Sequence, residues 1–209
     1  LSDLLVFGRR AGLGASDYVR AMSNRPAVTQ DAVDKAKDMA LAVFDGPSDG
    51  SPENPYTLQL DMQDTMNNLV GIIRKADEMQ EALDKLQELR QRYKKVKVEG
   101  DRKFNPGWHL AMDLRNMLLV SESVAKSAIT RTESRGGHTR DDFPTMDASW
   151  RNHLLVCRSE GDDPVVPDVN VSKERQPTMR PDLLETFELS ELEKYYTDDE
   201  LLEHPQRKA

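Results

Sequence analysis

Residues 75–96 read KADEMQEALDKLQELRQRYKKV, and this stretch decides the fold. Its apolar side chains recur every three or four positions, which is the spacing of one face of an α-helix. The residues of that face are Met79, Leu83, Leu86, Leu89 and Tyr93. The other positions are mostly charged and suit contact with water. Such a helix requires partner helices, because one apolar stripe must be buried against another element.

Two further helical patterns flank that stretch. The first runs from about Tyr56 to Arg74, and its apolar face consists of Leu58, Met62, Met66, Leu69, Ile72 and Ile73. The second runs from about Gly107 to Thr132, with Asn105 and Pro106 suited to its cap and first turn. The connections are short and polar, which favours antiparallel neighbours. The sequence therefore predicts an up-down-up, spectrin-repeat-like three-helix bundle.

The chain ahead of the bundle carries two more helical patterns. One runs from Leu1 to Ala21 and the other from Asp31 to Phe44, with Thr29 as its cap. The apolar pattern is already running at Leu1 and no initiator methionine precedes it. We therefore expect the sequence to be part of a longer protein.

The character of the sequence changes after Thr132. One short strand is predicted at Leu154–Val156, and the Pro-rich, acidic stretch Asp162–Pro181 is predicted to be extended. Leu183–Leu202 is expected to hold short helical turns, with Tyr195 and Tyr196 as anchors.

The predicted fold is thus mainly α, in three parts. These are an N-terminal helix (1–24), the helical bundle (25–133), and a polar turn with an extended acidic tail (134–209).

Charge and composition exclude several classes of protein. The net charge is -8, and residues 159–209 carry all of the imbalance, because the first 158 residues hold equal numbers of acidic and basic side chains. An acidic tail argues against a nucleic-acid partner, since phosphates are bound by clustered Lys and Arg. No apolar run approaches the roughly 18–20 residues of a membrane span. The single cysteine, Cys157, excludes an internal disulfide and is expected to pack near a core.

The sequence offers few candidates for chemistry. None of the four histidines is paired at the i, i+4 spacing of a helical metal site, and no cysteine accompanies them at ligand spacing. No Ser-His-Asp, Cys-His or phosphate-loop pattern is present. We therefore predict no metal site, and none of these catalytic patterns occurs in this chain.

One dense polar segment stands out, Arg131 to Pro144, which reads RTESRGGHTRDDFP. It follows a long helix, where cations are favoured by the helix dipole and Gly136 suits a left-handed C-cap. Arginine side chains can bind backbone carbonyls and carboxylates together into a rigid turn. Two interpretations stay open at this point: a self-satisfied structural turn, or a site for an anion or substrate.

The same segment resembles the motif Arg-x-Glu-Ser-Arg-Gly-x-His-x-Arg-x-Asp-aromatic-Pro of the succinate dehydrogenase, fumarate reductase and L-aspartate oxidase flavoproteins, and it is complete here. Residues 105–117 resemble the last bundle helix of that family's C-terminal domain. Leu1–Gly12 resembles the helix that closes the family's FAD-binding domain. The long acidic tail resembles actinobacterial succinate dehydrogenases more than aspartate oxidases.

The resemblance implies a function for the whole subunit: interconversion of succinate and fumarate with FAD, and electron transfer to an iron–sulfur subunit. It implies a cytoplasmic location, peripheral at the inner face of the cell membrane through that subunit and its membrane anchor subunits. The family's catalytic and dicarboxylate-binding residues would lie upstream of Leu1, so the chain alone is expected to be inactive and not to retain FAD. The direction of the reaction in vivo stays open.

Four residues receive roles from the resemblance. Leu1 would contribute a backbone contact to the flavin at a helix N-terminus. Arg135, His138 and Arg140 would be structural or interface residues and not catalytic ones. Two alternatives are kept: a stand-alone helical interaction module, and the corresponding part of an L-aspartate oxidase.

Overall fold

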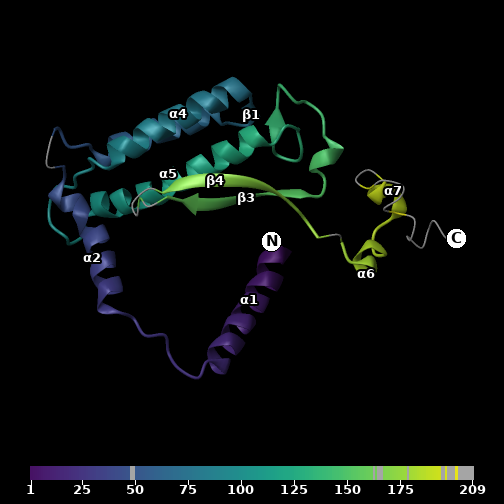
Figure 1. Cartoon of the computed structure of the whole chain (residues 1–209), viewed down its shortest axis with the longest axis horizontal. Helices are drawn as coiled ribbons and strands as arrows, with labels where there is room; N and C mark the ends of the chain where they lie inside the picture. The colour runs from purple at the N-terminus through teal and green to yellow at the C-terminus, as the bar shows by residue number, and fades with distance from the viewer. Residues whose placement is uncertain are drawn as a thin grey trace. The chain divides into compact units, whose positions relative to one another are not determined.

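The computed structural model describes residues 1–47, 50–161, 163, 167–177, 179–193, 196 and 201 (Figure 1). The chain divides into two compact units, Leu1–Ala40 and Leu41–Ala209. Its long elements are helices, which confirms the predicted mainly α fold.

The first unit holds helix α1 (Ser2–Ala21) and most of helix α2 (Gln30–Asp45). Both agree with the predicted bounds to within one residue. Thr29 Oγ1 accepts a hydrogen bond from the backbone N–H of Ala32 at 3.3 Å, which confirms the predicted cap. Helix α1 contains no buried residue, and its N-cap position, Leu1, supplies no side-chain cap.

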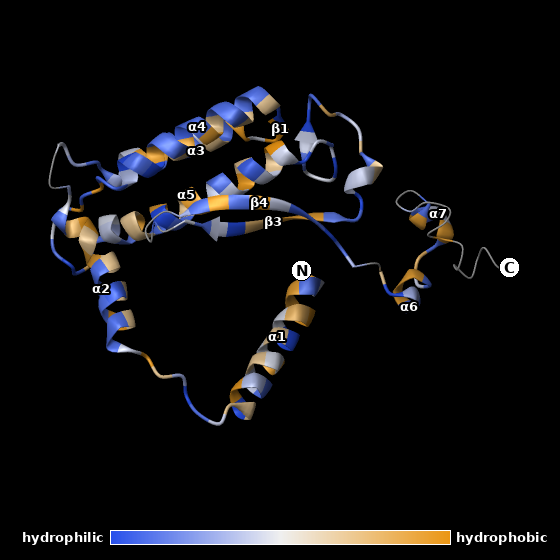
Figure 2. Cartoon of the chain, viewed as in Figure 1, coloured by the Kyte–Doolittle hydropathy of each residue, from blue (hydrophilic) through white to orange (hydrophobic). Residues whose placement is uncertain are grey.

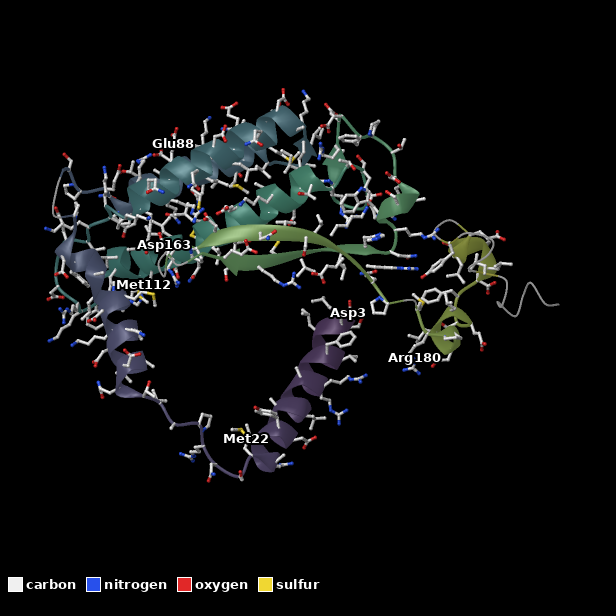
Figure 3. All side chains as sticks on the ribbon, viewed as in Figure 1. Asp3, Met22, Glu88, Met112, Asp163 and Arg180 are labelled. Carbon is white, nitrogen blue, oxygen red and sulfur yellow. The ribbon has the colours of Figure 1, made fainter. Side chains whose placement is uncertain are left out.

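The second unit is built on three helices, α3 (Pro55–Leu69), α4 (Ala76–Tyr93) and α5 (Pro106–Thr130). Along each of them apolar residues alternate with hydrophilic ones (Figure 2), and charged side chains such as Glu88 cover the outer side of α4 (Figure 3). The core that they share consists of Leu58, Met62, Val70, Ala82, Leu86, Leu89, Tyr93, Val96, Val98, Ala111, Leu114, Leu118 and Ala125. The predicted three-helix bundle is confirmed.

Helix α3 ends five residues earlier than predicted. The chain leaves the helix after Leu69, and Ile73–Arg74 forms a short strand, β1, instead of a last helical turn. Gly71 explains part of this path, because a Cβ there would lie 2.8 Å from the carbonyl oxygen of Asn67. The predicted burial of Ile72 was wrong: its side chain is 81% exposed.

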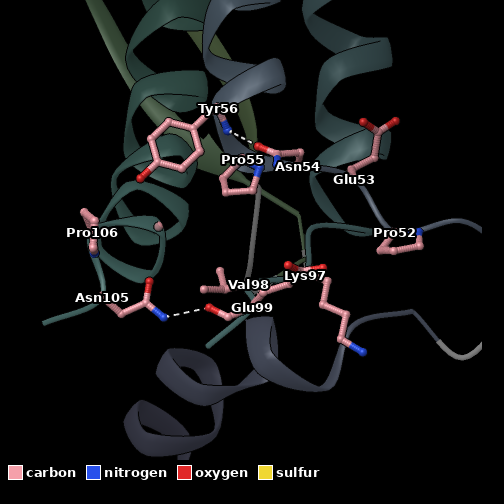
Figure 4. Close-up of a pocket in the computed structure, with 11 residues that line it drawn as sticks. Pro52, Glu53, Asn54, Pro55, Tyr56, Lys97, Val98, Glu99, Asn105 and Pro106 are labelled. Carbon is pink, nitrogen blue, oxygen red and sulfur yellow. Dashed lines mark hydrogen bonds between the residues drawn. The ribbon is translucent and has the colours of Figure 1, made fainter. Parts of the chain in front are cut away.

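Two asparagines begin bundle helices in the same way. Asn54 accepts from the N–H of Tyr56 at 2.8 Å, and Asn105 accepts from the N–H of Trp108 at 3.1 Å. Each is followed by a proline at the first helical position. The two starts line a hollow of about 380 Å³ (Figure 4). Because the asparagines and prolines use or remove N–H groups there, the two helix N-termini offer few backbone donors to the hollow.

Replacing Asn105 with alanine should lower the free energy of unfolding by about 1–2 kcal/mol. The amide of Asn105 caps α5 and also donates to the carbonyls of Glu99 and Asp101, at 2.9 and 2.8 Å. Urea unfolding followed by circular dichroism would measure the loss. Asn105→Asp keeps the cap but not the two donated bonds, so it should lose less than the alanine variant. An alanine variant of unchanged stability would contradict the assignment.

A two-stranded antiparallel hairpin covers one side of α5. Its strands are β3 (His153–Glu160) and β4 (Asp168–Arg175). The sequence predicted only Leu154–Val156 as a strand and left β4 as unpaired extended chain, which was wrong. Lys126 on α5 donates to the carbonyl of Val169 at 2.7 Å. Docking on the helix therefore stabilises the hairpin.

A buried ion pair reinforces this docking. Arg90 on α4 contacts Glu122 on α5 at 3.1 Å and Asp168 on β4 at 2.7 Å. Lys126 also contacts Glu122 at 2.7 Å. Within β4 the buried Val169 lies between the exposed Asp168 and Asn170, as expected of a strand with one face covered. Sequence alone could not show this docking, because Arg90 and its partner acids lie far apart in the chain.

The segment after the hairpin holds two one-turn helices, α6 (Pro181–Leu184) and α7 (Leu189–Leu192), which confirms the predicted short helical turns in the part that is described. Tyr196 lies under the guanidinium of Arg151, 5.3 Å from ring centre to Cζ. Tyr195, the other predicted anchor, lies outside the described residues. Among the described helices, none is both long and apolar enough to cross a membrane.

Candidate functional site: the polar turn after helix α5

The polar segment forms one compact turn where α5 ends, and we call residues 131–147 the polar turn. Helix α5 stops at Thr130, and the chain reverses at Arg135–His138, whose backbones bond to each other at 2.8 and 3.0 Å. Gly136 occupies the left-handed region here, with φ +59°. The prediction that Gly136 caps α5 was wrong: Gly136 allows this tight reversal, six residues beyond the helix end.

Glu133 is the buried acceptor at the centre of the polar turn, with 0% exposure. Its carboxylate accepts from Arg131 at 2.6 Å, from Arg135 at 2.9 and 3.0 Å, and from the N–H of Asp147 at 2.9 Å. Burial alone raises the pKa of Glu133, but the hydrogen bonds from Arg135, Asp147 and Arg131 outweigh it and hold the pKa at about 2. Glu133 is therefore a fixed anion that ties the turn together.

Arg140 closes the end of α5. It is 1% exposed, and its Nη1 donates to the carbonyls of Ala128, Ile129 and Arg131 at 3.0–3.1 Å. Its Nε and Nη2 donate to the two oxygens of Asp142, both at 2.6 Å. Two carbonyls of the last helical turn and that of the C-cap residue Arg131 are thus satisfied by one side chain.

Asp142 carries this connection to a second helix. One of its oxygens also accepts from the N–H of Ala76, the first residue of α4, at 3.1 Å. The hydrogen bonds from Arg140 lower the pKa of Asp142 to about 2, against the opposing effect of burial. Nearby, strand β2 (Thr139–Arg140) pairs in parallel with β1. The polar turn therefore joins the end of α5 to the start of α4.

The His138 ring lies between one side-chain partner and one backbone partner. Its Nδ1 is 2.8 Å from Nη1 of Arg74, and its Nε2 is 3.3 Å from the carbonyl oxygen of Arg131. Burial lowers the pKa of His138; the Arg131 carbonyl opposes this, and the charges of Arg74, Arg140 and Arg131 lower it further. A neutral ring that accepts from Arg74 and donates from Nε2 to Arg131 satisfies both contacts.

Trp150 connects the polar turn to the hairpin. It is 5% exposed, on the 3-10 helix η1 (Ala148–Trp150), and its indole N–H donates to Thr132 at 3.1 Å. Cations lie over its ring, with Cζ of Arg131 at 4.8 Å and Nζ of Lys173 at 3.8 Å from the centre. These contacts add packing to the hydrogen bonds of the turn.

The structure brings Arg135, His138 and Arg140 together in one cluster, while Leu1 belongs to the other unit. Sequence reasoning missed Arg74 and Trp150. Trp150 lay just beyond the motif, and Arg74 was assigned to a helix, so no pattern related it to His138. Within the described part of the chain no group of three or more His, Cys, Asp or Glu residues could hold a metal ion. The structural interpretation of the turn accounts for the contacts of its arginines and carboxylates.

Comparison with known proteins agrees with this geometry. Residues 59–192, which include the bundle, the polar turn and the hairpin, match the family described as fumarate reductase flavoprotein C-term. The chain belongs to the succinate dehydrogenase and fumarate reductase flavoprotein family. The match and the polar turn place it in the C-terminal part of such a flavoprotein.

Relatives within the family are similar over most of this chain. The succinate dehydrogenase flavoprotein subunit of Coxiella burnetii is 34% identical over 160 residues, and the fumarate reductase flavoprotein subunit of Haemophilus influenzae is 35% identical over 168. These matches cover 76% and 78% of this chain but only 27% of either relative. The chain thus spans about a quarter of the length of its curated flavoprotein relatives.

Solved structures of the family are similar in fold. The Mycobacterium smegmatis Sdh1 complex in the apo form aligns with a TM-score of 0.90 and 66% identity, over 98% of this chain and 34% of that one. An E. coli quinol fumarate reductase aligns with a TM-score of 0.72 and 26% identity, over 84% of this chain and 30% of that one. An adenosine-5-phosphosulfate reductase at 16% identity shares the fold alone.

Proposed function

We propose that this chain supports a flavoprotein subunit that interconverts succinate and fumarate with FAD and passes electrons to an iron–sulfur subunit. The observation that carries the proposal is the complete polar turn, with its carboxylates bound by arginines, in a domain of this flavoprotein family. In this proposal the chain holds the subunit's fold and one of its interfaces, and the reacting residues lie in the part of the subunit outside it.

FAD would meet this chain at Leu1. No side chain caps the N-terminus of α1, so the first backbone N–H groups of that helix lack intrahelical partners. Such groups fit an acceptor that carries partial negative charge, as the flavin's pyrimidine edge does. FAD, when bound, would supply the hydride chemistry. The backbone at Leu1 would orient the ring and favour its anionic reduced form.

The roles of Arg135, His138 and Arg140 are proposed to be structural first. The guanidinium of Arg140 donates to three carbonyls and to Asp142, and that of Arg135 donates to Glu133. These contacts support a structural role. Arg135 and His138 are only partly buried, so these two of the three residues would reach an interface, whereas Arg140 is buried.

The partners follow from the same proposal. An iron–sulfur subunit would accept the electrons, and membrane anchor subunits would hold the complex at the inner face of the cell membrane. Co-purification of the intact protein with an iron–sulfur subunit would support this assignment. Isolation of an active protein without such a subunit would favour an L-aspartate oxidase instead, and a native product of this chain's mass, 23.7 kDa, would favour a stand-alone module.

The activity test compares two proteins. We expect the intact subunit to bind FAD and oxidise succinate with an artificial electron acceptor. We expect the 209-residue chain to be colourless and inactive, because Leu1 alone offers the flavin a single backbone contact. Visible absorbance and a dye-reduction assay would measure both properties. A yellow, active preparation of the 209-residue chain would refute the proposal.

A further inference from the structure

A shallow groove runs between α5 and β3, beside the polar turn. We call it the α5–β3 groove and define it by Arg74, Val120, Val124, Leu154, Leu155 and Cys157. Its volume is about 530 Å³. The side walls are apolar yet open to solvent: Val120 is 59% exposed, Leu154 is 48% and Val124 is 40%. Among the residues that the structure describes, no Asp or Glu lines it.

Arg74 lies at the end of the groove, and no carboxylate in the described part of the chain pairs with it. Its Nε donates to the carbonyl of Gly71 at 2.8 Å and its Nη1 donates to Nδ1 of His138 at 2.8 Å. Neither partner is charged, and no described acidic residue forms an ion pair with Arg74. The side chain is partly buried, and this removal of the charge from water lowers the pKa of the guanidinium. A partly desolvated cation of this kind is stabilised by an anion.

The neighbouring cations differ from Arg74 in this respect. Glu133 contacts Arg131 at 2.6 Å, and Asp142 contacts Arg140 at 2.6 Å. Arg74 therefore adds an unbalanced positive charge to the mouth of the polar turn. Its position identifies the missing group as a carboxylate or similar anion that enters through the groove.

The apolar walls of the groove indicate what kind of molecule carries the anion. On the α5 side the exposed apolar part of the groove runs from Val120 to Val124, about 6 Å at 1.5 Å per residue, and Ala128 beyond it lines the groove but is only 5% exposed. Together with the exposed Leu154 on β3, this apolar surface suits the side chains of a chain segment better than a small ion. The groove is open along its length, as docking of a segment requires.

We infer that the α5–β3 groove receives an apolar segment of the same subunit, from the part outside this chain, whose Asp or Glu side chain pairs with Arg74. The inference rests on the proposed function, since the chain covers only 27% of its curated flavoprotein relatives and most of such a subunit lies outside it. Because that part is covalently attached, its effective concentration at the groove is high.

Cys157 provides the test, because it lines the groove and is exposed in this chain. Its exposure corrects the prediction that the thiol packs near a core. A maleimide should modify Cys157 rapidly in the 209-residue chain. In the intact flavoprotein subunit the reaction should be at least about tenfold slower, equivalent to ~1.4 kcal/mol of protection. Mass spectrometry of the peptide that contains Cys157 separates it from other cysteines of the subunit.

Variants assign the protection to Arg74. In the intact subunit Arg74→Gln should restore most of the reactivity of Cys157, whereas Arg74→Lys, which keeps the charge, should restore less. Val124→Glu, on an exposed wall position, should also restore it by placing a second carboxylate in the groove. Arg180→Gln removes the same charge from an exposed ion pair outside the groove and should change nothing. Each variant's rate in the intact subunit is compared with its own rate in the 209-residue chain, because a charge change near Cys157 also alters the reactivity of the thiol itself.

Three results would overturn the inference: equal reactivity of Cys157 in the chain and the intact subunit, protection that requires the iron–sulfur subunit, or protection that survives Arg74→Gln. Equal reactivity would mean that the groove is empty in the intact subunit. Protection that requires the iron–sulfur subunit would mean a different occupant, and protection that survives Arg74→Gln would mean that no carboxylate pairs with Arg74. Succinate oxidation is measured separately on the same preparations. A subunit that is inactive but protected would therefore defeat the proposed function alone.

Discussion

Glu133→Gln should lower the free energy of unfolding of this chain by about 3 kcal/mol, one of the two largest effects we expect. The side chain is fully buried and accepts hydrogen bonds from Arg131, Arg135 and the N–H of Asp147. Glutamine has nearly the same shape, but it is neutral and one of its two terminal groups is a donor. Two guanidinium groups would lose their counterion, and one donor would face another.

Urea unfolding monitored by circular dichroism would measure this loss. The matched control is Glu81→Gln, which breaks the exposed pair with Lys85 on α4 and should cost less than about 0.5 kcal/mol. Equal stability of the two variants would show that the polar turn contributes little to the fold.

The pH dependence of stability should have the same origin. The pKa of Glu133 is about 2 in the folded chain against 4.5 for the free side chain. Because the folded-state pKa is depressed, the stabilisation is fully present above about pH 5 and is lost as the pH falls toward 2. That difference corresponds to roughly 3 kcal/mol. Melting temperatures between pH 6 and pH 2.5 should fall steeply in the natural chain and less steeply in Glu133→Gln.

Arg140→Met is the second variant with a large expected effect, a loss of about 3–4 kcal/mol. Methionine keeps the apolar stem but removes all five hydrogen bonds that the guanidinium makes. The carbonyls of Ala128, Ile129 and Arg131 at the end of α5 would lose their donor, and Asp142 would lose its cation.

Arg140→Lys distinguishes charge from geometry. An ammonium group cannot reach three carbonyls and both carboxylate oxygens together, so this variant should still lose about 2 kcal/mol. Arg158→Lys on β3, where the side chain is 59% exposed, should lie within about 0.5 kcal/mol of the natural chain. Thermal unfolding of the four proteins provides the comparison. If Arg140→Lys were as stable as the natural chain, the fork geometry would be unimportant.

Periodicity predicted the bundle well because each of its helices buries one apolar face against the other two. It failed at Ile72 and Ile73, since two apolar residues continue the helical pattern although Gly71 and the pairing of β1 with β2 take the chain elsewhere. It also failed for β4, whose strand state depends on β3 and on contacts with Lys126 and Arg90. Such long-range contacts leave no mark in local spacing.

The polar turn was identified from its residues, but the contacts that its side chains make were not. A motif shows that arginines and acids lie close in sequence. It does not show that Arg140 donates to carbonyls at the end of α5, or that Asp142 accepts from the first N–H of α4. The position of Arg74 beside His138 depends on the early end of α3, which the pattern did not predict.

The bond between Asp142 and Ala76 also bears on how the chain folds. It joins residues 66 positions apart, so a loop that contains α4 and α5 must close before it can form. Helices α4 and α5 can pair earlier, through contacts nearer in sequence. This bond should therefore be absent from the folding transition state, and it would slow unfolding more than it speeds folding. In a cell, it would lengthen the lifetime of the folded domain without changing the rate at which the domain forms.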